Sequence, residues 1–109
     1  MQAKTPQDFF NIEAPTRFKA EKARGIDVIA LLNLIGPNGG DWTVIIRNQK
    51  MNISEGTHPT PTLMIKMNED DFMNIIQGKL SAEKAFFLGK IQIKGNIAIA
   101  LKLKEAGIL

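Results

Sequence analysis

Apolar and polar residues alternate with a period of two between residues 26 and 67, a pattern typical of half-buried β-strands. Residues 26–35 (IDVIALLNLI) are mostly apolar on both faces of such a strand, so we expect a central strand that is covered on each side. Further strands are expected at residues 42–47, 50–54 and 61–67. Asn48 and Gln49 form a tight connection that makes the second and third strands antiparallel neighbours.

Beyond Asn68 the period of the apolar positions changes to about 3.6, which predicts a helix at residues 68–77. Asn68 suits the N-cap, and the three acidic residues that follow complement the positive end of the helix dipole. Gly78 is expected to end this helix. Ser81 is expected to cap a second short helix, which Gly89 ends in turn.

The two ends of the chain are described by different patterns. The sequence Thr5-Pro6-Gln7-Asp8 combines a capping hydroxyl, a proline at the first helical position and an acid in the first turn. It predicts a short helix to about Glu13, which ends before Pro15 because proline restricts the conformation of the preceding residue.

Residues 90–104 (KIQIKGNIAIALKLK) have branched aliphatic residues at most odd positions, and by periodicity alone they form a β-hairpin.

Composition limits the size and the chemistry of the molecule. The 109 residues, 44% of them apolar, suffice for one single-core domain spanning 1–109. We find no apolar run long enough for a membrane span or a signal peptide, so we expect a cytoplasmic protein. With no cysteine and one histidine, disulfides, a cysteine nucleophile and zinc sites are excluded, and neither a metal nor a cofactor is expected.

The net charge of +3 is mild, and it favours ordinary solvated surface over nucleic-acid binding. The chain has no tyrosine and one tryptophan, whereas nucleic-acid binding calls for exposed aromatics among basic residues, so no nucleic-acid partner is expected. An anionic membrane surface stays open as a transient partner, since lysines attract acidic lipid. Two basic clusters are candidates for this contact: Arg17, Lys19, Lys22 and Arg24, and Lys90, Lys94, Lys102 and Lys104.

The order of elements, a helix, four strands, two short helices and the segment 90–104, indicates an α+β fold. Three blocks in that order resemble the sterol carrier protein type 2 family over residues 18–103. They are GGDWTVII, TLMIKMNEDDF and GKLSAEKAFFLGKIQIKGNIAIALKL. The most specific parts are the glycine-spaced stretch 78–89 and the Gly95-Asn96 junction.

The resemblance implies a five-stranded, mostly antiparallel sheet covered by short helices, with a hydrophobic tunnel between sheet and helices. It also implies that residues 91–94 are the last strand and that 97–104 form a helix, which overrides the hairpin. Asn96 as N-cap and the nearby alanines permit this change. Such a helix is apolar on two sides, with Ile97 and Leu101 nearly opposite Ile99 and Leu103, and therefore needs two partners.

By resemblance, the second partner is an apolar ligand, and the protein is a single sterol-carrier-type domain that binds and transfers lipid without catalysis. Fatty acid, acyl-CoA and phospholipid are favoured over sterol, because the chain resembles short, stand-alone prokaryotic-type members. The expected ligand-binding residues are Phe72, Ile75, Ile76, Phe86, Phe87, Ile97, Ala100, Leu101 and Leu103. The alternative is a small interaction module that buries its apolar surface in a partner protein or a homodimer. The oligomeric state, monomer or dimer, stays open.

No catalytic constellation emerges from the sequence, so no enzyme activity is expected. His58 has no sequence-local partner to orient it as a base. The acidic run at residues 69–71 is explained by the helix dipole rather than by acid/base chemistry or a metal. The sequence ends Ala106-Gly107-Ile108-Leu109 rather than in a Ser-Lys-Leu signal, so we expect no peroxisomal import.

Overall fold

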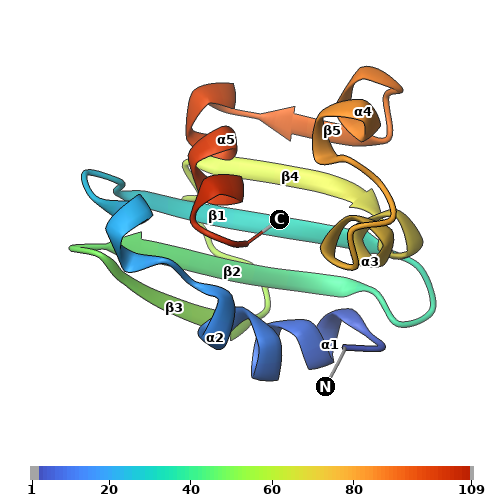
Figure 1. Ribbon diagram of the computed structural model, residues 1–109, viewed down its shortest axis with the longest axis horizontal. Coiled ribbons are helices and arrows are strands. Elements are labelled where there is room, and N and C mark those ends of the chain that lie inside the picture. The colour runs from blue at the N-terminus through green and yellow to red at the C-terminus, as the bar shows by residue number, and fades with distance from the viewer. Residues whose placement is uncertain (1–2, 109) are drawn as a thin grey trace.

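The computed structural model describes residues 3–108 and has at its centre one five-stranded sheet in the order β3-β2-β1-β4-β5 (Figure 1). Met1, Gln2 and Leu109, which enter the expectations about a leader and an import signal, lie outside the described residues. The strands are β1 (Val28–Ile35), β2 (Gly40–Arg47), β3 (Lys50–Glu55), β4 (Leu63–Asn68) and β5 (Ile91–Lys94).

The pairing of the strands makes the sheet mixed. β1, β2 and β3 form the predicted antiparallel meander, and Asn48 and Gln49 close its second turn with φ angles of 53° and 61°. β4 crosses over to the other side of β1 and pairs with it in parallel. β5 then pairs antiparallel with β4 and forms one edge of the sheet. The α+β class and the central place of β1 are confirmed.

The helices cover one face of the sheet, as Figure 1 shows. Val28, Leu32 and their period-two neighbours on β1 belong to the hydrophobic core under the helices. Ile29 and Leu31 point to the other face, where no helix is present among residues 3–108. The expectation that β1 is covered on both sides is confirmed, since these two side chains are buried although no second helical layer lies over them.

The N-terminal helical segment continues past the proline that was expected to end it. It runs from α1 (Pro6–Asp8) through the π-helical turn η1 (Phe9–Glu13) into α2 (Ala14–Arg17). Thr5 caps it as predicted, its hydroxyl accepting a bond from the Asp8 backbone N–H at 3.2 Å. In a regular α-helix the ring of Pro15 would clash with the carbonyl four residues earlier, and the wider π turn makes room for it.

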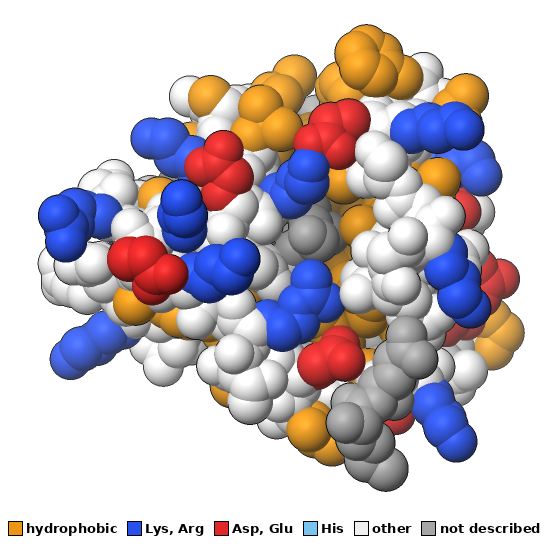
Figure 2. All heavy atoms as spheres, in the orientation of Figure 1, with side chains coloured by type: hydrophobic (Ala, Val, Ile, Leu, Met, Phe, Trp, Pro, Cys, Tyr) orange, Lys and Arg blue, Asp and Glu red, His pale blue; other side chains and the backbone are white. Residues whose placement is uncertain are grey.

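The remaining helices follow the predicted order. The short 3₁₀ helix η2 (Ala20–Ala23) precedes the sheet. The helices in the C-terminal half are α3 (Glu69–Ile76), α4 (Ala82–Phe87) and α5 (Ile97–Glu105). Ser81 caps α4 through a bond from the Lys84 backbone N–H, and Asn96 caps α5. Figure 2 shows hydrophobic side chains gathered along the upper edge of this face, where Figure 1 places α4 and α5.

A cluster of four aromatic rings fills the space between the sheet and the helices α1, η1 and α3. Phe10 stacks on Trp42 of β2 with ring centroids 5.0 Å apart, and on Phe72 of α3 at 5.5 Å. Phe9 meets Phe72 edge to face at 5.4 Å. Because all four rings are buried and in contact, this part of the interior is closed core.

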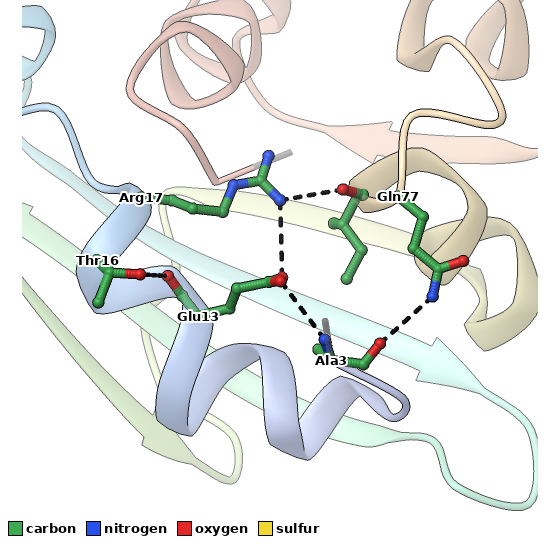
Figure 3. Close-up of polar contacts among 6 residues, drawn as sticks. Ala3, Glu13, Thr16, Arg17 and Gln77 are labelled. Carbon is green, nitrogen blue, oxygen red and sulfur yellow. Dashed lines mark hydrogen bonds and ion pairs between the residues drawn. The ribbon is translucent and has the colours of Figure 1, made fainter. Parts of the chain in front are cut away.

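Polar contacts tie the N-terminal segment to the end of α3 (Figure 3). The Arg17 guanidinium donates to the carbonyl of Ile76 at 3.2 Å and lies 3.9 Å from the Glu13 carboxylate. The Gln77 side chain donates to the Ala3 carbonyl at 3.3 Å. These bonds hold the N-terminal segment against α3 and so close the core on that side.

Glu69 has a more specific structural role than helix-dipole complementarity. Its buried carboxylate accepts a bond from the Asn38 backbone N–H at 3.0 Å, which holds the β1–β2 turn against α3. Gly36 has φ of 149°, and a Cβ there would stand 2.6 Å from Cγ of Glu69. Within residues 3–108, no helix is long and apolar enough to cross a bilayer.

Candidate functional site

An apolar groove of about 260 Å³ lies at the β5 edge of the sheet, between α4 and α5. Ile65 of β4 and Ile91 and Ile93 of the edge strand β5 form its floor. The side chains that line it are Ile65, Ala82, Glu83, Phe86, Phe87, Ile91, Ile93, Ile97, Ala100, Leu101 and Lys104. Nine of these eleven are hydrophobic, so the groove suits an apolar guest.

One wall of the groove is α5, which has the two apolar sides expected of it. Leu103 is fully buried in the core, whereas Ile97 and Leu101 line the groove and are each 48% exposed. The helix starts here because the Asn96 side-chain oxygen accepts a bond from the Ala98 backbone N–H at 2.8 Å. The sheet is thus one partner of α5, and the groove side has no protein partner among the described residues.

The opposite wall is α4, which touches the core mainly through Ala85. Phe86 and Phe87 both line the groove, and they are 37% and 86% exposed. Their rings meet edge to face with centroids 6.3 Å apart. The sequence suggested that one of the two rings would anchor the core, and this is wrong because α4 lies at the sheet edge, where the small Ala85 side chain makes the contact.

An ion pair between Glu83 of α4 and Lys104 of α5 joins the two walls of the groove. Glu83 also accepts a bond from the Ser81 hydroxyl at 3.0 Å. Chiefly through its bond to Lys104, the pKa of the Glu83 carboxyl is lowered to about 2 from its ordinary value of 4.5. Among residues 3–108, these are the only charged side chains that line the groove, and each neutralises the other.

The structure separates the nine residues that the sequence placed at a ligand site. Phe86, Phe87, Ile97, Ala100 and Leu101 come together around the groove. The other four lie elsewhere: Phe72, Ile75 and Leu103 are buried in the core, and Ile76 packs against it. They do not line the groove because α3 packs on the aromatic cluster and Leu103 faces inward.

The sequence did not point to several lining residues. Ile65, Ile91 and Ile93 follow from strand alternation only once it is known which sheet face the helices cover. Glu83 and Lys104 are 21 residues apart in the chain, and no local pattern indicates their pairing. The resemblance implied a hydrophobic tunnel between sheet and helices; the apolar space lies between them as an open groove at the sheet edge, and the aromatic cluster closes the interior beneath α3.

Other parts of the structure are weaker candidates. A wider hollow of about 640 Å³ lies between the N-terminal segment and the β2–β3 turn, but polar side chains such as Asn11, Gln49 and Asn52 share its lining. The imidazole of His58 accepts a bond from the Thr60 backbone N–H at 3.0 Å in an exposed loop, and it does not line the groove. The sequence thus missed this local partner of His58.

Comparison with known proteins agrees with the fold and the sequence blocks. Residues 12–106 match the model of the SCP-2 sterol transfer family. The chain belongs to this family. Members of this family bind and transfer lipids, and the chain therefore has a lipid-binding fold. It is 34% identical over 83 residues to human hydroxysteroid dehydrogenase-like protein 2, an alignment that covers 75% of this chain and 20% of that protein.

Solved structures show the same fold. Palmitated sterol carrier protein 2-like 2 from Aedes aegypti has a TM-score of 0.63 and 25% identity, and the match covers 84% of this chain and 88% of that one. A double mutant of a sec-alkyl sulfatase from Pseudomonas sp. has a TM-score of 0.83 and 22% identity over 96% of this chain and 16% of the sulfatase. The latter likeness concerns the fold alone. This family member spans about a fifth of its human relative.

Proposed function

We propose that the groove between α4, β5 and α5 binds the acyl chain of a fatty acid or fatty acyl-CoA and that the protein carries this ligand without altering it. The observation that carries the proposal is the aliphatic and aromatic lining of the groove. The palmitated relative from Aedes aegypti supports an acyl chain as guest. A non-catalytic role is supported by Glu83 and Lys104, which are bonded to each other.

The volume of the groove favours an acyl chain over a sterol. A methylene group is about the size of a water molecule, which occupies roughly 30 Å³. The groove of about 260 Å³ therefore holds roughly eight methylene groups. A flexible chain can enter such a groove in part, with its remainder on the exposed rim. A rigid ring system has to fit as one body, and pockets for compact ligands typically measure about 300–1,000 Å³.

The energetics suit a carrier. Burial of roughly eight methylenes stabilises the complex by about 6 kcal/mol at about 0.8 kcal/mol each. Association costs on the order of 4–15 kcal/mol, so the groove as it stands gives weak and reversible binding. Exposed Ile97 and Phe87 on opposite walls can cover a longer chain if α4 and α5 move apart, which adds affinity with each further methylene.

The test is native mass spectrometry of the protein as purified, then titration of the delipidated protein with palmitate. We expect a bound lipid that palmitate displaces, and loss of palmitate binding in Leu101→Trp, whose indole fills the groove. The matched control is Ile12→Trp on η1, because Ile12 is exposed and does not line the groove. Both variants should unfold at the same urea concentration as the parent chain.

Two results would contradict the proposal. Palmitate that binds the parent chain and Leu101→Trp equally would place the acyl chain outside the groove. A chain that takes up no palmitate at all, yet forms a dimer in light scattering, would favour the interaction module.

A further inference from the structure

The exposed hydrophobic side chains of this protein are concentrated around the mouth of the groove. Eight large apolar residues are exposed among residues 3–108, and five of them belong to the segment from α4 to α5. They are Phe86, Phe87, Leu88, Ile97 and Leu101. We call these five side chains the apolar rim. An apolar patch of this kind on a soluble fold marks an interaction surface.

The same segment carries the positive charge of the chain. Residues 78–105 contain six lysines and two glutamates, a net charge of +4, whereas the rest of the chain has a net charge of −1. Lys84, Lys94 and Lys102 are exposed and form no ion pair within residues 3–108. Figure 2 shows lysine and arginine side chains beside the hydrophobic upper edge.

From this combination we infer that the apolar rim docks on an anionic membrane surface, with the lysines of residues 78–105 around it. Phe87 and Leu88, 86% and 59% exposed at the end of α4, are the side chains that enter the bilayer interface. The acidic headgroups attract the lysines through long-range electrostatics. This inference goes beyond acyl-chain binding and does not depend on which ligand occupies the groove.

The charge decides between a membrane and a protein partner. A homodimer through the rim would bring two copies of a +4 segment together, and like charges oppose that contact. An anionic bilayer offers an apolar layer for the rim and negative charge for the surrounding lysines. Docking there also points the mouth of the groove at the lipid, so an acyl chain passes between bilayer and groove with less exposure to water.

The experiment is co-sedimentation of the full chain with phosphatidylcholine vesicles that contain or lack phosphatidylserine. We expect binding to the phosphatidylserine vesicles, and a steep loss of binding from about 0.1 M to about 1 M salt, where the Debye length falls from about 10 Å to about 3 Å. Lys84→Glu should weaken binding at least about fivefold, because each lysine near an anionic surface contributes about that factor.

Substitutions on the rim separate the apolar contribution from the charge. The double variant Phe87→Ala/Leu88→Ala keeps the charge and should lower the partition coefficient by about tenfold or more through lost apolar burial. Ile12→Ala is the matched control, since Ile12 is 60% exposed on η1, outside the segment. Ile93→Trp fills the groove from its floor, outside the apolar rim, and should still bind vesicles while it loses palmitate, so the two proposals can fail separately.

The inference is overturned if phosphatidylserine vesicles bind no better than phosphatidylcholine alone, or if the rim variant and Ile12→Ala bind alike. It is also overturned if the parent chain binds no vesicles and light scattering shows a dimer that Phe87→Ala/Leu88→Ala dissociates, because the rim would then be covered by a second copy.

Discussion

Lys104 on α5 is bonded to Glu83 on α4, so one ion pair connects the two walls of the apolar groove. Both side chains are partly exposed, and a surface pair of this kind contributes little to the stability of the fold. It nevertheless restrains α4 and α5 at the site where an acyl chain is proposed to enter. The first prediction concerns the protonation of this pair.

The Glu83 carboxyl should titrate with a pKa of about 2 in the parent chain. Because the folded pKa lies below the ordinary 4.5, the pair stabilises the contact above pH 4.5 and is lost as the pH falls toward 2. Lys104→Met should return the pKa of Glu83 toward 4.5, measured by NMR titration of its side-chain carbon. Lys84→Met, which removes a lysine not bonded to Glu83, should leave it unchanged; an equal shift in both variants would contradict a specific pair.

Asn96→Ala should lower the free energy of unfolding by about 1 kcal/mol, because it removes the side-chain cap of α5. Asn96→Asp keeps an oxygen that can accept the bond from Ala98 and should cost little. Urea denaturation of the three proteins checks this. If Asn96→Ala and Asn96→Asp lose the same stability, the cap bond is not what stabilises the start of α5.

Affinity for fatty acids should depend on chain length in a way that reports on the groove. We expect it to rise about fourfold per methylene up to roughly eight to ten carbons, which follows from about 0.8 kcal/mol per buried methylene. Calorimetric titration from hexanoate to palmitate measures it. A plateau beyond ten carbons indicates a rigid groove, a continued rise indicates separation of α4 and α5, and no dependence on length would exclude burial of the chain.

Much of the fold was predictable from local chemistry. Strands β1, β2 and β3 followed from period-two alternation and from the turn at Asn48 and Gln49. The caps at Ser81 and Asn96 followed from side chains that bond the backbone within the next three residues. Such signals act over a few residues, and a sequence contains them in full. The segment 97–105 shows the limit, because its period favoured a strand and the family resemblance was needed to predict the helix.

The sequence by itself determined the strands β1, β2 and β3 and the caps of α4 and α5. Tertiary structure alone decided that β4 lies parallel to β1, that the helices cover one face, and that the helical segment continues past Pro15. It also decided that Phe72 belongs to the core whereas Phe87 lines the groove, and that Glu83 meets Lys104. The reason is physical. Which apolar residues touch depends on how elements distant in the chain pack together, and that packing depends on all the side chains that fill the shared interior.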